Sequence, residues 1–356
     1  MDISFLTFDQ SESFRKAWDD FVQAHPSAAR GHLSAVFYFS NPAANHSLIA
    51  VDDHGAVVGI LPLFEVEDKE LRGLPYRRLV SAGEFPAGPL LAGNLPARVR
   101  RNVLDAMLDK VRGIAAARKA DEVSIAYPLI DGDRTSLETY GYYPLRHYAF
   151  QEENRVVLLL DLTVDEKQLF SNLDSNCRNA IKRCMKSGAV VRKIDTREEW
   201  LSCYDLNVKT LGAHADSREH MAIIWDHFVL AGLADVLAVD SDGAIVAVVV
   251  TVRYKSAYYW KSYRDRDRNV IGANNLGLWQ GILDAQTNGC RFFELGGMEF
   301  ANTKQVAISS FKESFGGRPV YQLAGRWVSR PLRRAWLDMG RAGVEAFRER
   351  RRSAAP

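Results

Sequence analysis

The sequence predicts an α/β (α+β) protein built from two similar halves, each a mixed β-sheet flanked by helices. Three observations lead to this fold class. A β-hairpin pattern occurs twice, the same order of helix and strand follows both copies, and the chain has enough apolar side chains for two cores. It has 356 residues, of which 47% are hydrophobic and 25% charged. Such a composition excludes the disordered, collagen-like and disulfide-scaffold classes.

The first hairpin lies at residues 48–64, LIAVDDHGAVVGILPLF, with apolar residues on both arms and Gly55 at the turn. The second lies at residues 237–254. There VDSDGAIVA aligns on VDDHGAVVG of the first copy and places Gly243 where Gly55 stands. Because Asp-Gly turns recur in unrelated sheets, the hairpins alone do not establish a repeat.

The helix and strand that follow each hairpin support an internal repeat. A helical pattern at residues 100–117 precedes a strand at 122–127, and a helical pattern at 275–288 precedes a strand at 291–295. Halves of this length fit the usual size of a domain, so we predict a tandem duplication. The predicted parts are an N-terminal domain, a C-terminal domain and a basic tail, at residues 1–152, 153–325 and 326–356.

Charge and cysteine usage narrow the function classes. Lys and Arg number 46 and Asp and Glu 44, a net charge of +2, which is too balanced for a protein whose whole surface is dedicated to nucleic acid. Any basic function must therefore be local, and no DNA partner is expected. No segment approaches the ~20 apolar residues of a membrane span, and the first residues do not form a signal peptide. Four cysteines without a CxxC pair fit reduced thiols. We expect a cytoplasmic protein.

An apolar run at residues 155–162, RVVLLLDL, predicts a buried strand. We expect one helix after it, capped by Thr163 and ended by Gly188. Basic residues stand off its apolar face, and no acid occurs from Asn176 to Lys193. This basic face is either merely solvated or a binding site for the phosphates of a donor, which pair well with guanidinium groups. On the second interpretation, the donor-binding residues are Arg178, Lys182 and Arg183.

Several segments of the C-terminal half stand in a fixed order. They are NCRNAIKRCMKSGAVVRK at residues 176–193, YDLNVKTLGAH at 204–214, the second hairpin, NNLGLWQGILDAQTNGCRFFELGGM at 274–298 and SSFKESFGG at 309–317. Together they resemble the Fem-type (FemAB-like) transferases and their BioF2-like acetyltransferase relatives, over most of residues 155–320. The N-terminal half matches only in pattern. The resemblance implies two tandem GNAT-like domains and transfer of an acyl or aminoacyl group onto an amine.

Such a transfer passes through a tetrahedral oxyanion, so a site needs a cation or N–H donors at the developing charge and a proton acceptor. The resemblance places Phe311 and Lys312 at the donor carbonyl, with Lys312 as the cation. Without the resemblance, Lys312 would be interpreted as a surface lysine.

Glu294 is the predicted catalytic carboxylate, because it ends a strand where open α/β sheets present ligand-binding groups. Its alternative role is to accept backbone N–H groups of the turn. Gly296 and Gly297, which follow it, are expected to bind the acceptor. Relatives often carry Asp-Gly-Arg here, so FELGGM lacks the usual basic residue and leaves the substrate class open.

The resemblance also implies a loop that cradles a donor pyrophosphate at a helix N-terminus. The loop here, NVIGAN at residues 269–274, keeps one glycine. The predicted donor-binding residues are therefore Gly272, Asn274 and the preceding Arg268, although Gly272 alone would be interpreted as a turn glycine. Lys261 and Tyr263 interrupt an aromatic strand. We expect Lys261 to bind the acceptor and Tyr263 to receive its proton.

His214, Asp216 and His220 superficially suggest metal ligands. Asp216 and Glu219 have the spacing of a capping box at a helix start, and two histidines without a third well-spaced ligand are common there. We predict no metal site.

The tail contains nine arginines and three acids. Apolar residues recur in it at helical spacing, so one face is apolar and the other basic, as in helices that lie at a membrane interface. These residues are Leu332, Trp336, Met339, Gly343 and Phe347. We expect peripheral contact with an anionic membrane; the alternative is a terminal helix packed on its domain.

These observations support three functional hypotheses. The first is a GNAT N-acyltransferase that uses acyl-CoA as a co-substrate, with no tightly bound cofactor, to acylate an amine of a sugar-linked or peptide cell-envelope precursor. The second takes aminoacyl-tRNA as donor and is favoured by the basic helix and the degraded loop. The third is a non-catalytic, envelope-associated binding module, because no general base is certain.

Overall fold

The computed structural model describes residues 2–69, 74–81, 83–129, 144–268 and 270–340. The chain divides into two compact units. Unit 1 comprises Met1–Pro128, Ser136–Asn154 and Leu323–Pro356, and unit 2 comprises Leu129–Thr135 and Arg155–Gln322.

Unit 1 contains two sheets, with strand orders β1-β2-β3-β6 and β4-β5-β7-β16-β8. The strands are β1 Ser4–Thr7, β2 Leu48–Val51, β3 Val57–Leu61, β4 Phe64–Lys69, β5 Pro75–Val80, β6 Leu90–Leu91, β7 Glu122–Ala126, β8 Gln151–Glu152 and β16 Ala324–Val328. The helices are α1 Glu12–Ala24 and α2 Ala97–Arg118, with short 3-10 turns at Arg30–His32, Ser34–Phe39, Pro42–Ala44 and Pro144–Tyr148. Helix α2 buries Val103, Met107 and Val111 in the core that it shares with both sheets.

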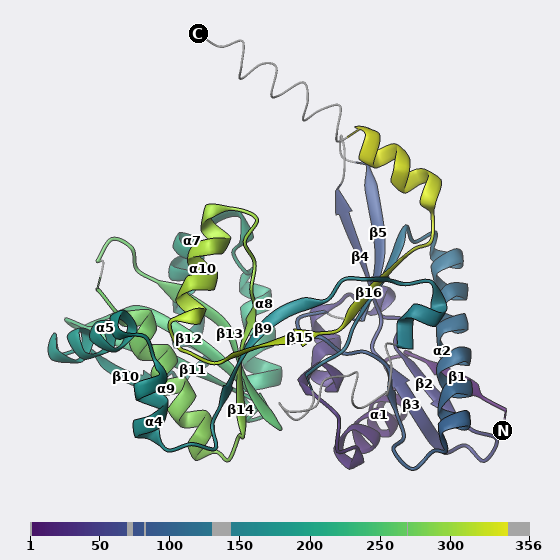
Figure 1. Cartoon of the computed structure of the whole chain (residues 1–356), viewed down its shortest axis with the longest axis horizontal. Coiled ribbons are helices and arrows are strands. Elements are labelled where there is room, and N and C mark those ends of the chain that lie inside the picture. Colours follow the sequence, from purple (N-terminus) through teal and green to yellow (C-terminus); the bar gives the residue numbers. More distant parts are fainter. Residues whose placement is uncertain (1, 70–73, 82, 130–143, 269, 341–356) are drawn as a thin grey trace, which may run out of the picture. The chain divides into compact units, whose positions relative to one another are not determined.

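Unit 2 is a seven-stranded mixed sheet in the order β10-β11-β12-β13-β14-β9-β15, flanked by helices (Figure 1). The strands are β9 Arg155–Asp161, β10 Val190–Lys193, β11 Ala234–Ser241, β12 Ala244–Tyr254, β13 Ser256–Arg264, β14 Phe292–Gly297 and β15 Arg318–Gln322. The helices are α4 Glu166–Asn172, α5 Ser175–Lys186, α6 Arg197–Ser202, α7 Tyr204–Leu211, α8 Arg218–Ile224, α9 Ala273–Thr287 and α10 Thr303–Glu313, with a 3-10 turn at Gly212–His214 and a π-helical turn at Trp225–Val229.

The two faces of this sheet carry different helices. Helix α9 covers one face, where Gly277 lies against Val239 and Val249. Trp200 of α6 stacks on Tyr263, which pairs with Val248 and so lies on the other face.

The predicted duplication is confirmed. Strands β2 and β3 form one antiparallel hairpin and β11 and β12 form the other. Their turn glycines, Gly55 and Gly243, have φ of +80° and +75°, in the left-handed region that favours glycine. A β-bulge follows Ala50 in the first ladder and Val239 in the second, within one residue of the same place in the repeat. In both units the long helix leads into a strand that pairs in parallel, β7 with β5 and β14 with β13.

The first strand of unit 2 and the last described strand of the chain both lie inside sheets, between strands that are distant in sequence. Strand β9 precedes all other strands of unit 2 but lies between β14 and β15. Strand β16 follows β15 but lies in unit 1, between β7 and β8. The expected tail therefore does not begin at Arg326, because Arg326 pairs with Ser124 inside a sheet.

The single helix predicted after residue 162 is wrong, because the structure has two, α4 and α5. Asp165 caps α4 by accepting the N–H of Gln168, and Asp174 caps α5 by accepting the N–H of Cys177 at 2.6 Å. Leu173 between them is extended, with ψ of 149°. Thr163 caps neither helix, since its N–H and hydroxyl both donate to Asp161. Gly188 does end α5, at φ of +82°.

All four cysteines are free thiols, as predicted: Cys177, Cys184 and Cys203 are buried and Cys290 is partly buried. Burial raises the pKa of each, that of Cys203 to about 11. A raised pKa favours the protonated, unreactive thiol.

The first part of the predicted tail packs on unit 1. Residues 331–340 are helical. Arg330 and Arg333 pair with Asp121, whose side chain is fully buried, and Leu337 is buried as well. A buried carboxylate needs paired cations, so these arginines have a structural role. The rest of the predicted tail, residues 341–356 with Gly343 and Phe347, lies outside the described residues.

We expect Gly272→Ala to destabilise unit 2 by about 3 kcal/mol, from the left-handed backbone and from overpacking. Gly272 has φ of +85°, and an added Cβ would lie 2.2 Å from the carbonyl oxygen of Ala180 in α5. Gly243→Ala is the control, because Gly243 has φ of +75° but nothing within 4 Å of an added Cβ. That control should lose about 1 kcal/mol. Urea unfolding followed by circular dichroism measures both, and equal losses would contradict the packing argument.

Candidate functional site

Strands β13 and β14 pair near their start and then separate. They pair in parallel only at Ala257 with Phe293 and at Tyr258 with Glu294, although β13 continues to Arg264 and β14 to Gly297. Open α/β sheets commonly bind ligands at the carboxyl ends of their strands. The residues beyond this separation therefore form the candidate site.

Lys312 of α10 reaches the end of β14. Its Nζ donates to the carbonyl oxygen of Gly297 at 2.7 Å. An added Cβ on Gly296 would lie 3.3 Å from this Nζ and 3.4 Å from the hydroxyl of Tyr258. Gly296, at φ of +83°, thus leaves open the space that Lys312 and Tyr258 border. The structure brings three predicted residues together, Gly296, Gly297 and Lys312, and adds Tyr258.

Burial lowers the pKa of Lys312, while the carboxylates of Glu299 and Glu294 act in the opposite direction. Glu294 itself is only 4% exposed. The site therefore holds a partly desolvated ammonium with two carboxylates near it, an arrangement that can stabilise a developing negative charge.

The loop between β14 and α10 is fixed to the helix that carries Lys312. Ser309 donates its hydroxyl to the carbonyl oxygen of Glu299 at 2.8 Å and accepts the N–H of Glu299 at 2.9 Å. Phe311 packs against Phe315 at 5.3 Å and Tyr259 at 6.3 Å between ring centroids, so it anchors α10 to the core.

Lys261 and Tyr263 meet at Asp216, a residue that the sequence analysis explained as a helix cap. Lys261 Nζ donates to one carboxylate oxygen at 2.9 Å and the Tyr263 hydroxyl to the other at 2.8 Å. Asn207, fully buried, exchanges two hydrogen bonds with the backbone of Asp216. The cap of α8 is Ser217, so the predicted capping box is wrong. The role of Asp216 was missed because Lys261 and Tyr263, which donate to its carboxylate, lie 45 and 47 residues away in sequence.

The structure does not bring Tyr263 to Lys312. Tyr263 is fully buried and stacks on Trp200. It lies five residues beyond Tyr258 along β13, or about 16 Å at the rise of an extended strand. The geometry therefore fits a positioning residue for Asp216 better than the predicted proton acceptor.

The two parts of the predicted donor site are adjacent. Gly272 precedes α9 and lies against Ala180 of α5, and Asn275 donates to the sulfur of Cys177 at 3.3 Å. Close packing of α5 is thus sufficient to explain the glycine at 272. The Oδ1 of Asn274 is buried and accepts no hydrogen bond within the described ranges.

The predicted basic residues differ in their partners. Arg178 donates to the carbonyl oxygens of Ser171 and Leu173, so it closes the end of α4. Lys182 lies over the ring of Phe170 at 5.6 Å. Arg183 is exposed, as is Arg268, which lies 3.9 Å from Asp265. In the part of the chain that the structure covers, no three His, Cys, Asp or Glu side chains are grouped to hold a metal ion.

We expect the stability of Lys312→Met relative to the parent to fall as pH rises from neutral toward the ordinary lysine pKa of about 10.4. Because the pKa of Lys312 is lowered in the folded protein, the unfolded parent binds more protons in this range, and the parent gains stability with pH. Urea unfolding across this range measures the difference. Lys304→Met, exposed on the same helix, is the control. A difference that moves the other way would contradict the desolvation of Lys312.

Comparison with known proteins supports the fold and the general chemistry. Residues 171–305 match the family described as acetyltransferase (GNAT) domain, a range that ends before Lys312. No curated protein matches the chain.

Solved structures with the same fold cover nearly the whole chain. The crystal structure of FemX is 14% identical, with a TM-score of 0.68 over 95% of this chain and 100% of that one. A tandem GNAT protein from the clavulanic acid biosynthesis pathway is 14% identical, with a TM-score of 0.56 over 92% and 99%. L-PGS from Bacillus licheniformis is 13% identical, with a TM-score of 0.57 over 94% and 97%. Residues 171–305 thus match an acetyltransferase (GNAT) domain, and the chain as a whole has the tandem fold that FemX also has.

Proposed function

We propose that this protein transfers an acyl group from acyl-CoA to an amine of a sugar-linked or peptide acceptor, of the kind found in cell-envelope precursors. The observation that carries the proposal is the partly desolvated ammonium of Lys312 at the separated ends of β13 and β14. The tandem GNAT relative, described as solved without AcCoA, supports acyl-CoA as the co-substrate.

In this proposal the acceptor nitrogen attacks the thioester carbonyl. The C–N bond forms, the C–S bond breaks, and the carbonyl oxygen carries negative charge in between. The ammonium of Lys312 stabilises that charge from its position next to Gly296. The carbonyl oxygen of Gly297, which accepts a hydrogen bond from the ammonium, holds it in place. Glu294 receives the amine proton, and the leaving thiolate takes a proton from water.

The proposed donor site is the start of α9 together with α5. Among the described residues no side chain caps α9, so the N–H groups that follow Ala273 and the side chain of Asn274 remain for a diphosphate. The exposed Arg183 adds positive charge. Lys261 and Asp216 hold the acceptor side, with Tyr263 positioning Asp216.

The rival donor is aminoacyl-tRNA. Another structure of this fold is titled a putative lysylphosphatidylglycerol synthetase domain, at 11% identity and a TM-score of 0.54. Such a name supports an aminoacyl donor, and so does the exposed basic surface of α5. Isothermal titration with CoA and with charged tRNA separates the two donors: saturable binding of only one excludes the other.

Lys312→Met should reduce turnover at saturating donor by about 100-fold or more, as loss of an oxyanion contact does. Release of free thiol from a panel of acyl-CoA donors with candidate amines measures it. Lys304→Met, on the same helix, should keep parental turnover. Parental turnover by Lys312→Met would remove this residue from the mechanism.

Arg183→Ala should weaken donor binding without changing stability, whereas Arg178→Ala should mainly destabilise the end of α4. Binding should fall with added salt, steeply if many RNA phosphates are neutralised and shallowly for a diphosphate. Titration at several salt concentrations, with thermal unfolding of both variants, gives the two readouts. Unchanged binding by Arg183→Ala would show that α5 is merely solvated.

We also propose that the protein acts at the inner face of an anionic membrane. In the part of the chain that the structure describes, no helix combines the length and apolar character needed to span a bilayer. The helix at residues 331–340 exposes Leu332, Trp336 and Met339, at 88%, 53% and 67%. Their spacing places them on one face, while Arg333 on another face pairs with Asp121. Such a helix can lie at a lipid interface.

Leu332→Ser should lower co-sedimentation with anionic vesicles about tenfold, since burial of a leucine is worth roughly 1.5 kcal/mol or more. Leu230→Ser, an equally apolar change at a residue 69% exposed in unit 2, should have no effect. Salt should release the parent from the vesicles. Equal loss in both variants, or no preference for anionic over zwitterionic vesicles, would contradict the membrane proposal.

A further inference from the structure

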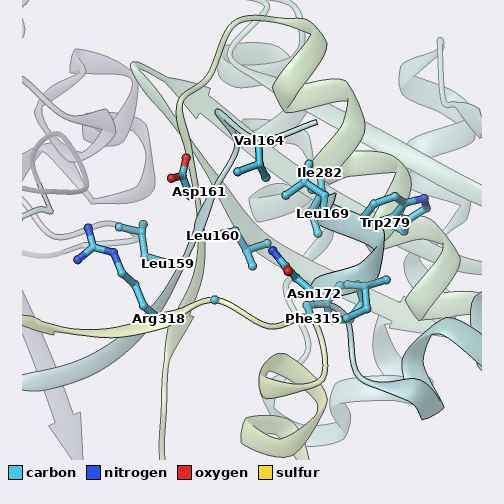
Figure 2. A pocket seen from close by; sticks show the side chains of 12 residues that line it. Leu159, Leu160, Asp161, Val164, Leu169, Asn172, Trp279, Ile282, Phe315 and Arg318 are labelled. Atoms are coloured by element: carbon cyan, nitrogen blue, oxygen red, sulfur yellow. The ribbon is translucent and has the colours of Figure 1, made fainter. Parts of the chain in front are cut away.

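Unit 2 contains a cavity that none of the residues proposed for catalysis, donor binding or acceptor binding lines. Its volume is about 240 Å³, and it lies between β9, α4, α9 and β15. Figure 2 shows Leu169, Ile282 and Trp279 gathered on one side of it and Asp161 and Arg318 on the other.

The walls of the cavity are apolar and its rim is polar. Leu160, Leu169, Leu173, Trp279, Ile282 and Phe315 line it and are each at most 7% exposed. The polar lining residues Asp161, Asn172 and Arg318 are exposed and so mark the opening. Hydrogen bonds from Thr163 lower the pKa of Asp161, which keeps its carboxylate charged beside the arginine.

The local backbone leaves this space open. Gly316 and Gly317 have φ of +77° and +95° where the chain turns from α10 into β15. An added Cβ on Gly316 would lie 2.7 Å from the carbonyl oxygen of Asn172, and one on Gly317 would lie 3.0 Å from that of Leu159. The turn therefore approaches α4 and β9 closely while it contributes no side chain to fill the cavity.

We propose that this cavity binds the aliphatic chain of a medium-length acyl group, with the acyl carbonyl at the polar rim. An apolar cavity of about 150 Å³ holds benzene, so this one has room for roughly eight to ten carbons. Apart from the indole N–H of Trp279, the buried side chains that line the cavity are aliphatic or aromatic hydrocarbons and offer no hydrogen bond to a nucleotide or sugar. Opposite charges at the rim suit an uncharged ester or thioester better than a free carboxylate. The proposal goes beyond the transfer reaction, because the bound aliphatic chain belongs either to a lipid or to the donor.

Isothermal titration with monodecanoyl glycerol and with decanoyl-CoA tests the proposal and separates these two sources, with CoA alone as reference. Affinity should rise about fourfold per methylene from hexanoyl to decanoyl chains. Ile282→Phe, which fills the cavity, should weaken chain binding at least tenfold. Ile308→Phe, at a residue 45% exposed outside it, should bind as the parent does. Absence of chain-length dependence would overturn the proposal, and so would parental binding by folded Ile282→Phe.

A second measurement covers the case in which Ile282→Phe does not fold. A decanoyl chain brominated near its end should quench the fluorescence of Trp279 in the parent. In Trp279→Phe that part of the quenching should be lost, while binding of the unbrominated chain persists. Equal quenching in the parent and in Trp279→Phe would place the chain elsewhere and overturn the proposal.

Discussion

The backbone hydrogen bonds of β9 position both the candidate site and the cavity of unit 2. This strand pairs with β14 on one side and with β15 on the other. Its ladder with β14 contains the bulge between Glu294 and Gly296 that turns Gly296 toward Lys312. Its ladder with β15 fixes the turn at Gly316 and Gly317, and Leu160 of the same strand forms a wall of the cavity. The candidate site and the cavity are therefore both built on one strand.

Two buried charged side chains, Asp121 and Lys312, have different surroundings in this protein. Asp121 of unit 1 is fully buried. The arginines that pair with it, Arg330 and Arg333, lie 209 and 212 residues away in sequence. Lys312 of unit 2 has a carbonyl at hydrogen-bond distance and two carboxylates farther off, and its pKa is lowered. The direct ion pairs of Asp121 stabilise the fold. The desolvated ammonium of Lys312 has no direct counterion among the described residues, so it is available to interact with a negatively charged ligand or intermediate.

Local patterns predicted the repeated hairpins, the helices that follow them and the strand at residues 155–162, because turn glycines and apolar periodicity are properties of short segments. Contacts distant in sequence were not predictable in this way. The break between α4 and α5 depends on two aspartates that act as caps, a signal present in the sequence but overridden by the apolar periodicity. The absence of acids from Asn176 to Lys193 in the sequence did not show that Arg192 is paired with Glu199 and with Asp240, which lies on another strand. The role of Asp216 was missed for the same reason, since Lys261 and Tyr263, which donate to its carboxylate, are on β13.

The position of β16, which follows unit 2 in sequence but completes a sheet of unit 1, sets an order in which the two units can become complete during synthesis. Unit 2 has all its strands once β15 has been made, because β9 comes first in its sequence. Unit 1 begins earlier but lacks β16 until residues 324–328 leave the ribosome, so β7 has no antiparallel partner on that side until then. An unpaired strand edge of this kind promotes wrong pairing between chains. The N-terminal half of this protein is thus the last to close, and its nascent form is the one that needs protection from aggregation.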